Sequence, residues 1–219
     1  MSTNRVTRHG PLARAVHWSV AAAVLALLAT GFLPVLGVEF NWVPLHWSIG
    51  LVLVAATLVH IVSVLIRWKS FRTMLLGARD LVRFGRALSP GAAPPKPGKY
   101  TIAQKLMHHA VTLAALVVIV TGLLMMVRVD TPFWERNPYL LDARTWGAVY
   151  VAHGFAAMSF VSLVILHIYF AVRPEKGFYL RAMLKGWITR EEHAANHDDA
   201  LWPAGARDPS APSRETTDA

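Results

Sequence analysis

Four long stretches of this 219-residue chain contain no Asp, Glu, Lys or Arg, and they restrict its possible folds more than any other feature. The stretches are Ala15 to Val38, Phe40 to Ile66, Leu106 to Val127 and Thr145 to Val172. Each can supply the roughly 20 apolar residues that cross a bilayer as a helix. Their continuous apolar character excludes the alternating strands of a membrane barrel. The sequence therefore predicts an all-α membrane protein, a four-helix bundle with helices near 15–36, 45–66, 106–127 and 147–172.

The basic residues are distributed unevenly about these stretches. Nineteen of the 22 lysines and arginines precede the first stretch, separate the second from the third, or follow the fourth. The other three are Arg128, Arg136 and Arg144. Because basic residues concentrate on the cytoplasmic side of a membrane, we expect both termini to be cytoplasmic. We interpret the net charge of +9 as a consequence of membrane orientation and of contact with anionic lipid, and not as a sign of nucleic-acid binding.

The segments outside the four stretches have distinct compositions. Ser70 to Leu88 has apolar residues and arginines on opposite helical faces. This pattern predicts an amphipathic cytoplasmic loop helix, which lies on the membrane surface or packs on a partner subunit. Ser89 to Gly98, rich in Pro, Gly and Ala, is typical of a linker. We expect residues 1–190 to form one domain and residues 191–219 to be a polar, disordered cytoplasmic tail, with His193 and His197 in solvent.

The chain has no cysteine. A disulfide, an iron–sulfur cluster, a covalently attached c-type haem and a thiolate zinc site are therefore all excluded within this chain.

Histidines in and beside the four stretches point to a function. The second stretch contains His46 and His60, and the fourth contains His153 and His167, each pair 14 residues apart. Fourteen residues are about 3.9 helical turns, so the members of a pair share a face and lie about 21 Å apart along the axis. Titratable residues at membrane depth are costly and usually functional. Imidazoles at two matched depths suit two non-covalent haems b, each held between facing helices.

The depths of the histidines suggest which of them face each other. His46 and His153 lie at the outer level and make one pair. His167 lies at the cytoplasmic level, where His17 and His60 are both candidate partners. His108 and His109, at the head of the third helix, suit an interfacial role. Arg14 could neutralise a haem propionate, and an ordinary basic anchor at the cytoplasmic membrane surface explains it equally well. A short repeat, Ala29-Thr30-Gly31 and Val120-Thr121-Gly122, hints at a duplicated helical hairpin.

Several motifs resemble those of a known family. Arg14 to Trp18 opening the first helix, and Leu45 to Gly50 opening the second, resemble the bacterial four-helix di-haem cytochromes b. Gly98-Lys99-Tyr100 followed by Gln104-Lys105 is more specific. Together with His167-Ile168-Tyr169 and Lys185-Gly186, this stretch is similar to the gamma subunit of respiratory formate dehydrogenase. Thr101 and Ala103 depart from that pattern, which has Asn and Gly there.

The resemblance implies specific ligands and partners. It pairs His46 with His153 on an outer haem and His17 with His167 on an inner haem. It leaves His60 without a counterpart, as an alternative inner ligand. It places reduction of menaquinone or ubiquinone near Gln104, on the cytoplasmic side of a bacterial inner membrane. It also implies an iron–sulfur subunit and a catalytic subunit as partners, because this chain cannot hold the donor clusters itself.

The sequence thus predicts an electron-transferring, quinone-reducing subunit of a respiratory oxidoreductase. It receives electrons from a periplasmic iron–sulfur subunit and passes them through two haems b to quinone. The alternatives are a stand-alone quinone-reactive cytochrome b, such as a superoxide oxidase, and a hydrogenase b-type cytochrome. A haem-free transporter with intramembrane histidines is a rival from another class.

Overall fold

The computed structural model describes residues 4–87 and 95–205 and divides the chain into two compact units. One, the membrane unit, comprises Val16–Ile61 and Met107–Tyr169. The other, the terminal unit, comprises Met1–Ala15, Val62–Leu106 and Phe170–Ala219.

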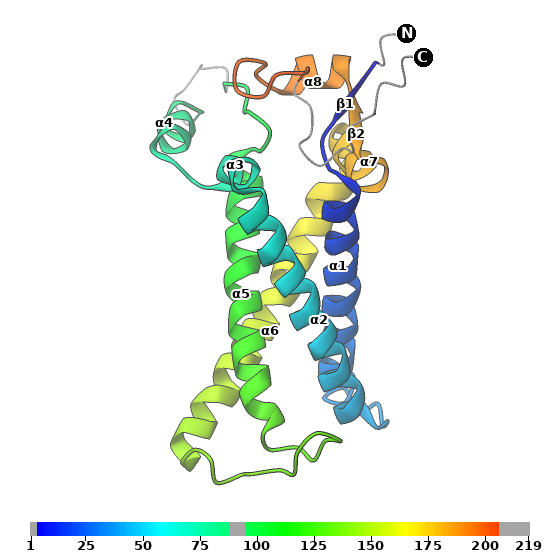
Figure 1. Ribbon diagram of the computed structural model, residues 1–219, viewed down its shortest axis with the longest axis vertical. Helices are drawn as coiled ribbons and strands as arrows, with labels where there is room; N and C mark the ends of the chain where they lie inside the picture. Colours follow the sequence, from blue (N-terminus) through cyan, green and yellow to red (C-terminus); the bar gives the residue numbers. More distant parts are fainter. Residues whose placement is uncertain (1–3, 88–94, 206–219) are drawn as a thin grey trace, which may run out of the picture. The chain divides into compact units, whose positions relative to one another are not determined.

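Four long helices confirm the predicted membrane-spanning bundle (Figure 1). They are α1 (Pro11–Phe32), α2 (Trp42–Ile66), α5 (Ile102–Met126) and α6 (Ala143–Val172). Their lengths of 22 to 30 residues suffice to cross the hydrocarbon core at 1.5 Å per residue. The chain is therefore a multi-pass membrane protein.

All four helices start three or four residues earlier than predicted, and the boundaries of α1 and α6 have local reasons. Helix α1 starts at Pro11, four residues before the charge-free stretch, because proline is favoured in the first helical turn. It ends at Phe32, shortly before Pro34, which cannot continue a helix. Helix α6 starts at Ala143 because the Asp142 carboxylate accepts a hydrogen bond from the backbone N–H of Thr145, at 3.0 Å.

The core of the membrane unit joins all four long helices. Ala23 and Val24 of α1 pack in one cluster with Leu53 of α2, Ala114 of α5 and Phe160 of α6. The alanines allow close approach of the helix backbones. Large apolar side chains elsewhere on the same helices stay exposed, such as Phe155 at 75% and Val151 at 72%. An apolar exterior of this kind suits lipid rather than water.

Tryptophans hold the loop that joins α5 to α6 in the membrane unit. The indole N–H of Trp134 donates to the Met126 carbonyl oxygen at 3.2 Å, and that of Trp146 donates to the Pro138 carbonyl oxygen at 2.9 Å. The guanidinium of Arg128 lies 5.2 Å from the centre of a Trp146 ring. The loop is thereby attached to both of its helices.

The terminal unit brings the two ends of the described chain together. Strand β1 (Arg5–Thr7) pairs antiparallel with β2 (Trp187–Thr189), so that Val6 lies opposite Ile188. Helix α7 (Gly177–Lys185), after the short turn η2 (Pro174–Lys176), leads into β2, and α8 (Arg190–Asn196) follows it. A small core forms around the sheet, made by Val6, Phe178, Ala182, Ile188 and Trp202.

The predicted disordered tail at 191–219 is wrong for its first part. Thr189 and Glu192 form a capping box that starts α8. His193 and His197, expected in solvent, are each only 2% exposed, and Trp202 is buried. The ring of His193 contacts that of Trp202, at 4.7 Å between centres. Residues 206–219 lie outside the described part of the chain.

The predicted loop helix is present but shorter than expected. Instead of one helix over residues 70–88, the structure has α3 (Trp68–Phe71), the 3₁₀ turn η1 (Arg72–Met74) and α4 (Ala78–Ala87). The Asp80 carboxylate accepts from the backbone N–H of Gly77 at 2.9 Å, which fixes the start of α4. Lys105 donates to the same carboxylate at 2.8 Å. The predicted linker from Ser89 lies largely outside the described residues.

Candidate functional site

The histidines of the membrane unit meet in three ring-to-ring pairs. His46 of α2 faces His153 of α6, with ring centres 6.4 Å apart and planes inclined at 68°. His17 of α1 faces His167 of α6, at 6.1 Å and 53°. We refer to these as the outer pair and the inner pair. His60 of α2 faces His108 of α5, also at 6.1 Å, and is called the side pair.

The pairing bears on the open choice of partner for His167. Of the two candidates, His17 is the one whose ring meets His167, whereas the ring of His60 meets His108. His108 also contacts His109, at 5.7 Å between ring centres. His17 contacts the neighbouring Trp18 edge-on, at 5.3 Å.

The outer pair is held by two threonines in equivalent positions. Thr30 Oγ1 of α1 lies 2.8 Å from Nδ1 of His46, and Thr121 Oγ1 of α5 lies 2.8 Å from Nδ1 of His153. The two threonines belong to the repeated Thr-Gly motif of the sequence. That repeat suggests a duplicated hairpin, but nothing in the sequence links the threonines with the histidines.

Glycines leave space beside the same rings. A Cβ added at Gly31 would lie 3.5 Å from Cε1 of His46, and one at Gly122 would lie 3.4 Å from Cε1 of His153. Among the described residues, no atom lies within 4 Å of a Cβ added at Gly50 or Gly154. A Cβ at Gly31 or Gly122 would thus be in ordinary van der Waals contact with the ring, and the space beside Gly50 and Gly154 is open.

The spacing of the pairs fits axial ligation of a haem iron. A metal–imidazole bond is about 2.0 Å long, and the bonded nitrogen lies about 1.1 Å from the ring centre, so imidazoles on opposite sides of one ion have centres about 6.3 Å apart. The outer and inner pairs, at 6.4 and 6.1 Å, match this distance, and the side pair, at 6.1 Å, matches it as well. On α6 their members His153 and His167 are separated by about 21 Å along the axis. Two neutral imidazoles per haem is also the donor set expected for electron transfer.

Arg14 and Gln104, the other candidate site residues, both have partners within the terminal unit. Arg14 Nη1 donates to the carbonyl oxygen of Leu184 at 2.6 Å, near the end of α7. Gln104 forms a capping box with Thr101 at the start of α5: its side-chain oxygen accepts from the Thr101 N–H at 3.0 Å. The Thr101 hydroxyl oxygen in turn accepts from the Gln104 N–H at 3.2 Å.

A buried arginine in the terminal unit was not anticipated from the sequence. Arg8 is 1% exposed, and its guanidinium lies over the rings of Tyr179, Tyr100 and Trp202, at 4.6 to 5.4 Å. Burial lowers the pKa of Arg8. Arg8 Nη1 lies 3.2 Å from Nε2 of His197, and Nδ1 of His197 lies 2.7 Å from the Gly98 carbonyl oxygen. His197 therefore donates through Nδ1 and accepts from Arg8 through Nε2, as only a neutral imidazole can.

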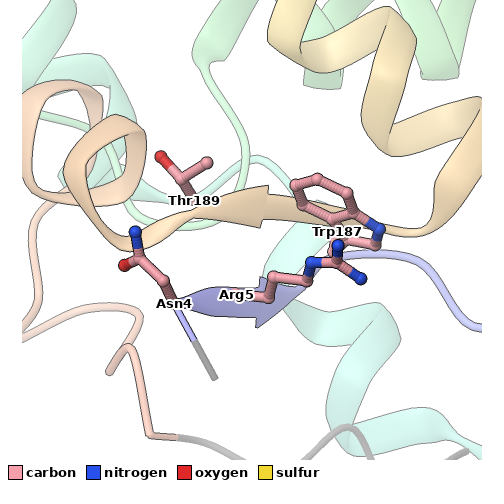
Figure 2. A pocket seen from close by; sticks show the side chains of 4 residues that line it. All are labelled: Asn4, Arg5, Trp187 and Thr189. Atoms are coloured by element: carbon pink, nitrogen blue, oxygen red, sulfur yellow. The ribbon is translucent and has the colours of Figure 1, made fainter. Parts of the chain in front are cut away.

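A shallow pocket in the terminal unit is separate from the histidine pairs. Figure 2 shows its lining residues: Asn4 just before β1, Arg5 on β1, and Trp187 and Thr189 on β2. The Arg5 guanidinium lies 4.1 Å from the centre of a Trp187 ring. Arg5 and Trp187 stack on each other, so the pocket is lined by side chains that are already engaged, and it contains no titratable pair.

The comparisons with known proteins agree with this geometry. A family model described as prokaryotic cytochrome b561 matches residues 8–186, which include all three histidine pairs. No curated protein matches the chain.

Proposed function

The chain belongs to the prokaryotic cytochrome b561 family, and from this premise we propose that it is the membrane-anchor, di-haem cytochrome b subunit of a respiratory dehydrogenase. Membership itself means a membrane cytochrome b that binds haem b and transfers electrons. The proposal adds the number of haems, the direction of transfer and the partners. The observation that carries it is the pair of facing histidines at each of two levels of the bundle.

Each haem has a defined set of protein ligands in this proposal. His46 and His153 hold the outer haem, and His17 and His167 hold the inner one. A haem b with imidazole at both axial positions takes up and releases single electrons without binding oxygen. We also assign Arg14 to a propionate of the inner haem, where its positive charge would offset the carboxylate. His60 is kept as the alternative inner ligand.

The charge distribution and the missing cysteines support the proposed direction of transfer. Nineteen basic residues on the side of the termini support a cytoplasmic location of both termini in a bacterial inner membrane. The chain cannot hold an iron–sulfur cluster, so its electrons come from another subunit. We assign the periplasmic loop 128–144 as the surface that contacts this iron–sulfur subunit, which is bound in turn to a catalytic subunit.

Quinone is the proposed electron acceptor, on the cytoplasmic side. Gln104 is assigned to the menaquinone or ubiquinone site by the resemblance of its motif to formate dehydrogenase gamma subunits, and formate is accordingly the proposed upstream substrate. Moving an electron inward opposes the membrane potential by up to about 2.3 kcal/mol per 100 mV. A strongly reducing donor such as formate can supply that free energy.

Anionic lipid is the proposed partner of α4. Its apolar side chains Leu81 and Phe84 are 69% and 49% exposed. The arginines of the same helix lie on the opposite face, at positions 79, 83 and 86. A helix with this division binds at the interface of a membrane that carries negative headgroups.

Purification of the tagged chain from its native membranes tests the proposal. We expect two haems b per chain in a pyridine haemochrome assay, a co-purifying iron–sulfur protein, and haem reduction when formate is added. A colourless protein would contradict the proposal entirely. A haem-loaded chain that purifies alone and is reduced by superoxide would replace the dehydrogenase subunit with a stand-alone cytochrome.

A further inference from the structure

Two threonine hydroxyls, on different helices, lie against the two rings of the outer pair at the same distance. The contacts are 2.8 Å from Thr30 to Nδ1 of His46 and 2.8 Å from Thr121 to Nδ1 of His153. In each, a threonine followed by glycine on the first helix of a hairpin meets the histidine on the second helix. The same local unit is therefore built twice, once by α1 and α2 and once by α5 and α6.

The hydrogen atoms in these contacts can be assigned. A hydroxyl group has one hydrogen to donate. Thr30 Oγ1 lies 2.9 Å from the carbonyl oxygen of Ala26, and Thr121 Oγ1 lies 2.5 Å from that of Val117, one helical turn earlier in each case. A carbonyl oxygen can only accept, so each hydroxyl donates to its own helix. The imidazole must then be the donor, from Nδ1–H to the threonine oxygen.

From this assignment we infer that Thr30 and Thr121 are positioning residues that fix the tautomer and orientation of the two outer haem ligands. With its proton on Nδ1, each ring presents the lone pair of Nε2, the nitrogen that is free to bind iron. The inference rests on the proposed function, because it takes His46 and His153 as ligands. It adds the residues that select which nitrogen of each ring binds.

Burial makes the threonine contacts stable against exchange with water. Thr30 is 6% exposed and Thr121 is 8% exposed. A hydroxyl oxygen in this environment has no competing solvent donor, so loss of the contact would remove the acceptor that orients the half-buried imidazole ring. Gly31 and Gly122, next in sequence, lie beside the two rings: a Cβ added there would be 3.5 Å from Cε1 of His46 and 3.4 Å from Cε1 of His153.

The contacts should also adjust the electronic properties of the outer haem. An imidazole that donates from its second nitrogen is a more basic ligand. A more basic ligand favours the ferric over the ferrous iron, so the threonines should lower the midpoint potential of the outer haem. Loss of such a contact typically weakens metal affinity about tenfold. A tenfold change in the ratio of ferric to ferrous affinity corresponds to about 59 mV for one electron.

The test replaces each threonine by an isostere in the full-length, haem-loaded protein. Thr30→Val and Thr121→Val remove the hydroxyl and keep the shape, whereas Thr30→Ser and Thr121→Ser restore the hydroxyl. Thr112→Val on α5 is the matched control, because the Thr112 hydroxyl donates to its own helix at the His108 carbonyl oxygen, at 2.8 Å, and the side chain is exposed. Spectroelectrochemical titration gives the midpoint potentials, and low-spin EPR signals report ligand orientation.

In each valine variant we expect one of the two midpoint potentials to rise. The rise should correspond to about a tenfold change in the ratio of ferric to ferrous affinity. The serine variants should return the potential to that of the wild type, and Thr112→Val should leave both potentials unchanged. If a valine variant accumulates poorly, Thr30→Ala and Thr121→Ala provide the same readout. Unchanged potentials and EPR signals in haem-loaded variants would overturn this inference alone. Wild-type protein without haem would instead overturn the proposed function.

Discussion

The outer and inner histidine pairs have nearly the same spacing, 6.4 and 6.1 Å between ring centres, but differ in what surrounds them. Both rings of the outer pair bond to a threonine and lie beside a glycine. Within the described residues, the rings of His17 and His167 have no equivalent hydrogen bond; His17 instead contacts Trp18 edge-on. A histidine pair can therefore reach nearly the same separation with or without hydrogen bonds from its rings to threonine.

This difference implies a division of roles between the two ends of the membrane unit. The outer pair is oriented by its own hairpins before any group binds, which favours a stable haem site. The inner pair keeps the freedom to choose a ring nitrogen, and the side pair adds two more imidazoles close to the same helix ends. His17 and His108 each lie six residues, about 9 Å, from the first residue of their helices. Proton-coupled chemistry such as quinone reduction suits the less constrained end.

The largest expected effect is the loss of a whole haem. His153→Ala and His46→Ala should each reduce the haem content from two per chain to one, because removal of one imidazole leaves the other without a partner across the iron. His167→Ala should do the same at the inner end. Pyridine haemochrome assays measure the content. Mild denaturant should release the haem of the inner pair before that of the outer pair; release in the reverse order would contradict the proposed difference between the pairs.

The next effect tests whether the inner pair is correctly identified. His17→Ala should leave one haem lost or high-spin, since an open axial position changes the spin state. His60→Ala should keep two low-spin haems, because its ring faces His108 rather than His167. Spectra of the two purified, reduced variants decide the matter. An inner haem lost from the His60 variant and retained in the His17 variant would assign the ligands the other way.

The fold of the membrane unit could be predicted because few physical rules govern it. Hydrocarbon sets the helix length, and the 14-residue spacing of His46 with His60 and of His153 with His167 follows from helix geometry. The roles of Thr30 and Thr121 could not be predicted, because they depend on how α1 meets α2 and how α5 meets α6. The repeated Thr-Gly motif hints at a duplicated helical hairpin, but it does not show which histidine ring each threonine hydroxyl contacts.

The terminal unit was harder to predict for a different reason. Its core joins Val6, near the start of the chain, with Ile188 and Trp202, near the end. Single apolar residues in polar segments carry no periodic pattern, so composition alone indicates disorder. The capping box of Thr189 and Glu192 was the available signal that a helix begins there.

Acid should act on the terminal unit and leave the bundle core intact. Burial, followed by the charge of Arg8, lowers the pKa of His197 to about 4, with smaller effects of His193 and Lys176. In the unfolded chain the pKa is about 6.5, so the unfolded state binds the proton first. The stability contributed by neutral His197 is thus complete above pH 6.5 and falls by up to about 3 kcal/mol as the pH drops to about 4.

Hydrogen exchange of the α8 amides as a function of pH measures this effect. His197→Gln cannot titrate and is the control, so its α8 should exchange with less dependence on pH between 6.5 and 4. The spectrum of the outer haem should stay constant over the same range, because the outer pair is held by threonines that do not titrate. An α8 whose protection is equally pH-dependent in both proteins would show that another group controls the acid response.

The smallest expected effect separates two roles of Gln104 at the less constrained end. Its side-chain oxygen caps α5 by accepting from the Thr101 N–H, and the proposal also assigns it to quinone. Loss of a helix cap costs about 1 kcal/mol, whether Gln104 or Thr101 is replaced. Thr101→Ala is therefore the matched control, since it disrupts the same cap from the other side.

Both variants should keep two haems and lose stability in a thermal unfolding assay, Gln104→Ala somewhat more, because the Gln104 oxygen also accepts from Arg8 Nη2 at 3.5 Å. If Gln104 contacts quinone, Gln104→Ala should slow haem reoxidation by added quinone several-fold beyond the effect of Thr101→Ala, because only the former removes the amide. Gln104→Glu retains an oxygen for the cap and should be as stable as the wild type. Its haems should nevertheless be reoxidised by quinone more slowly, because the variant loses the amide N–H₂ donor. Equal reoxidation rates in the alanine variants would reduce Gln104 to a capping residue and require the quinone site to be sought at other residues of the inner end.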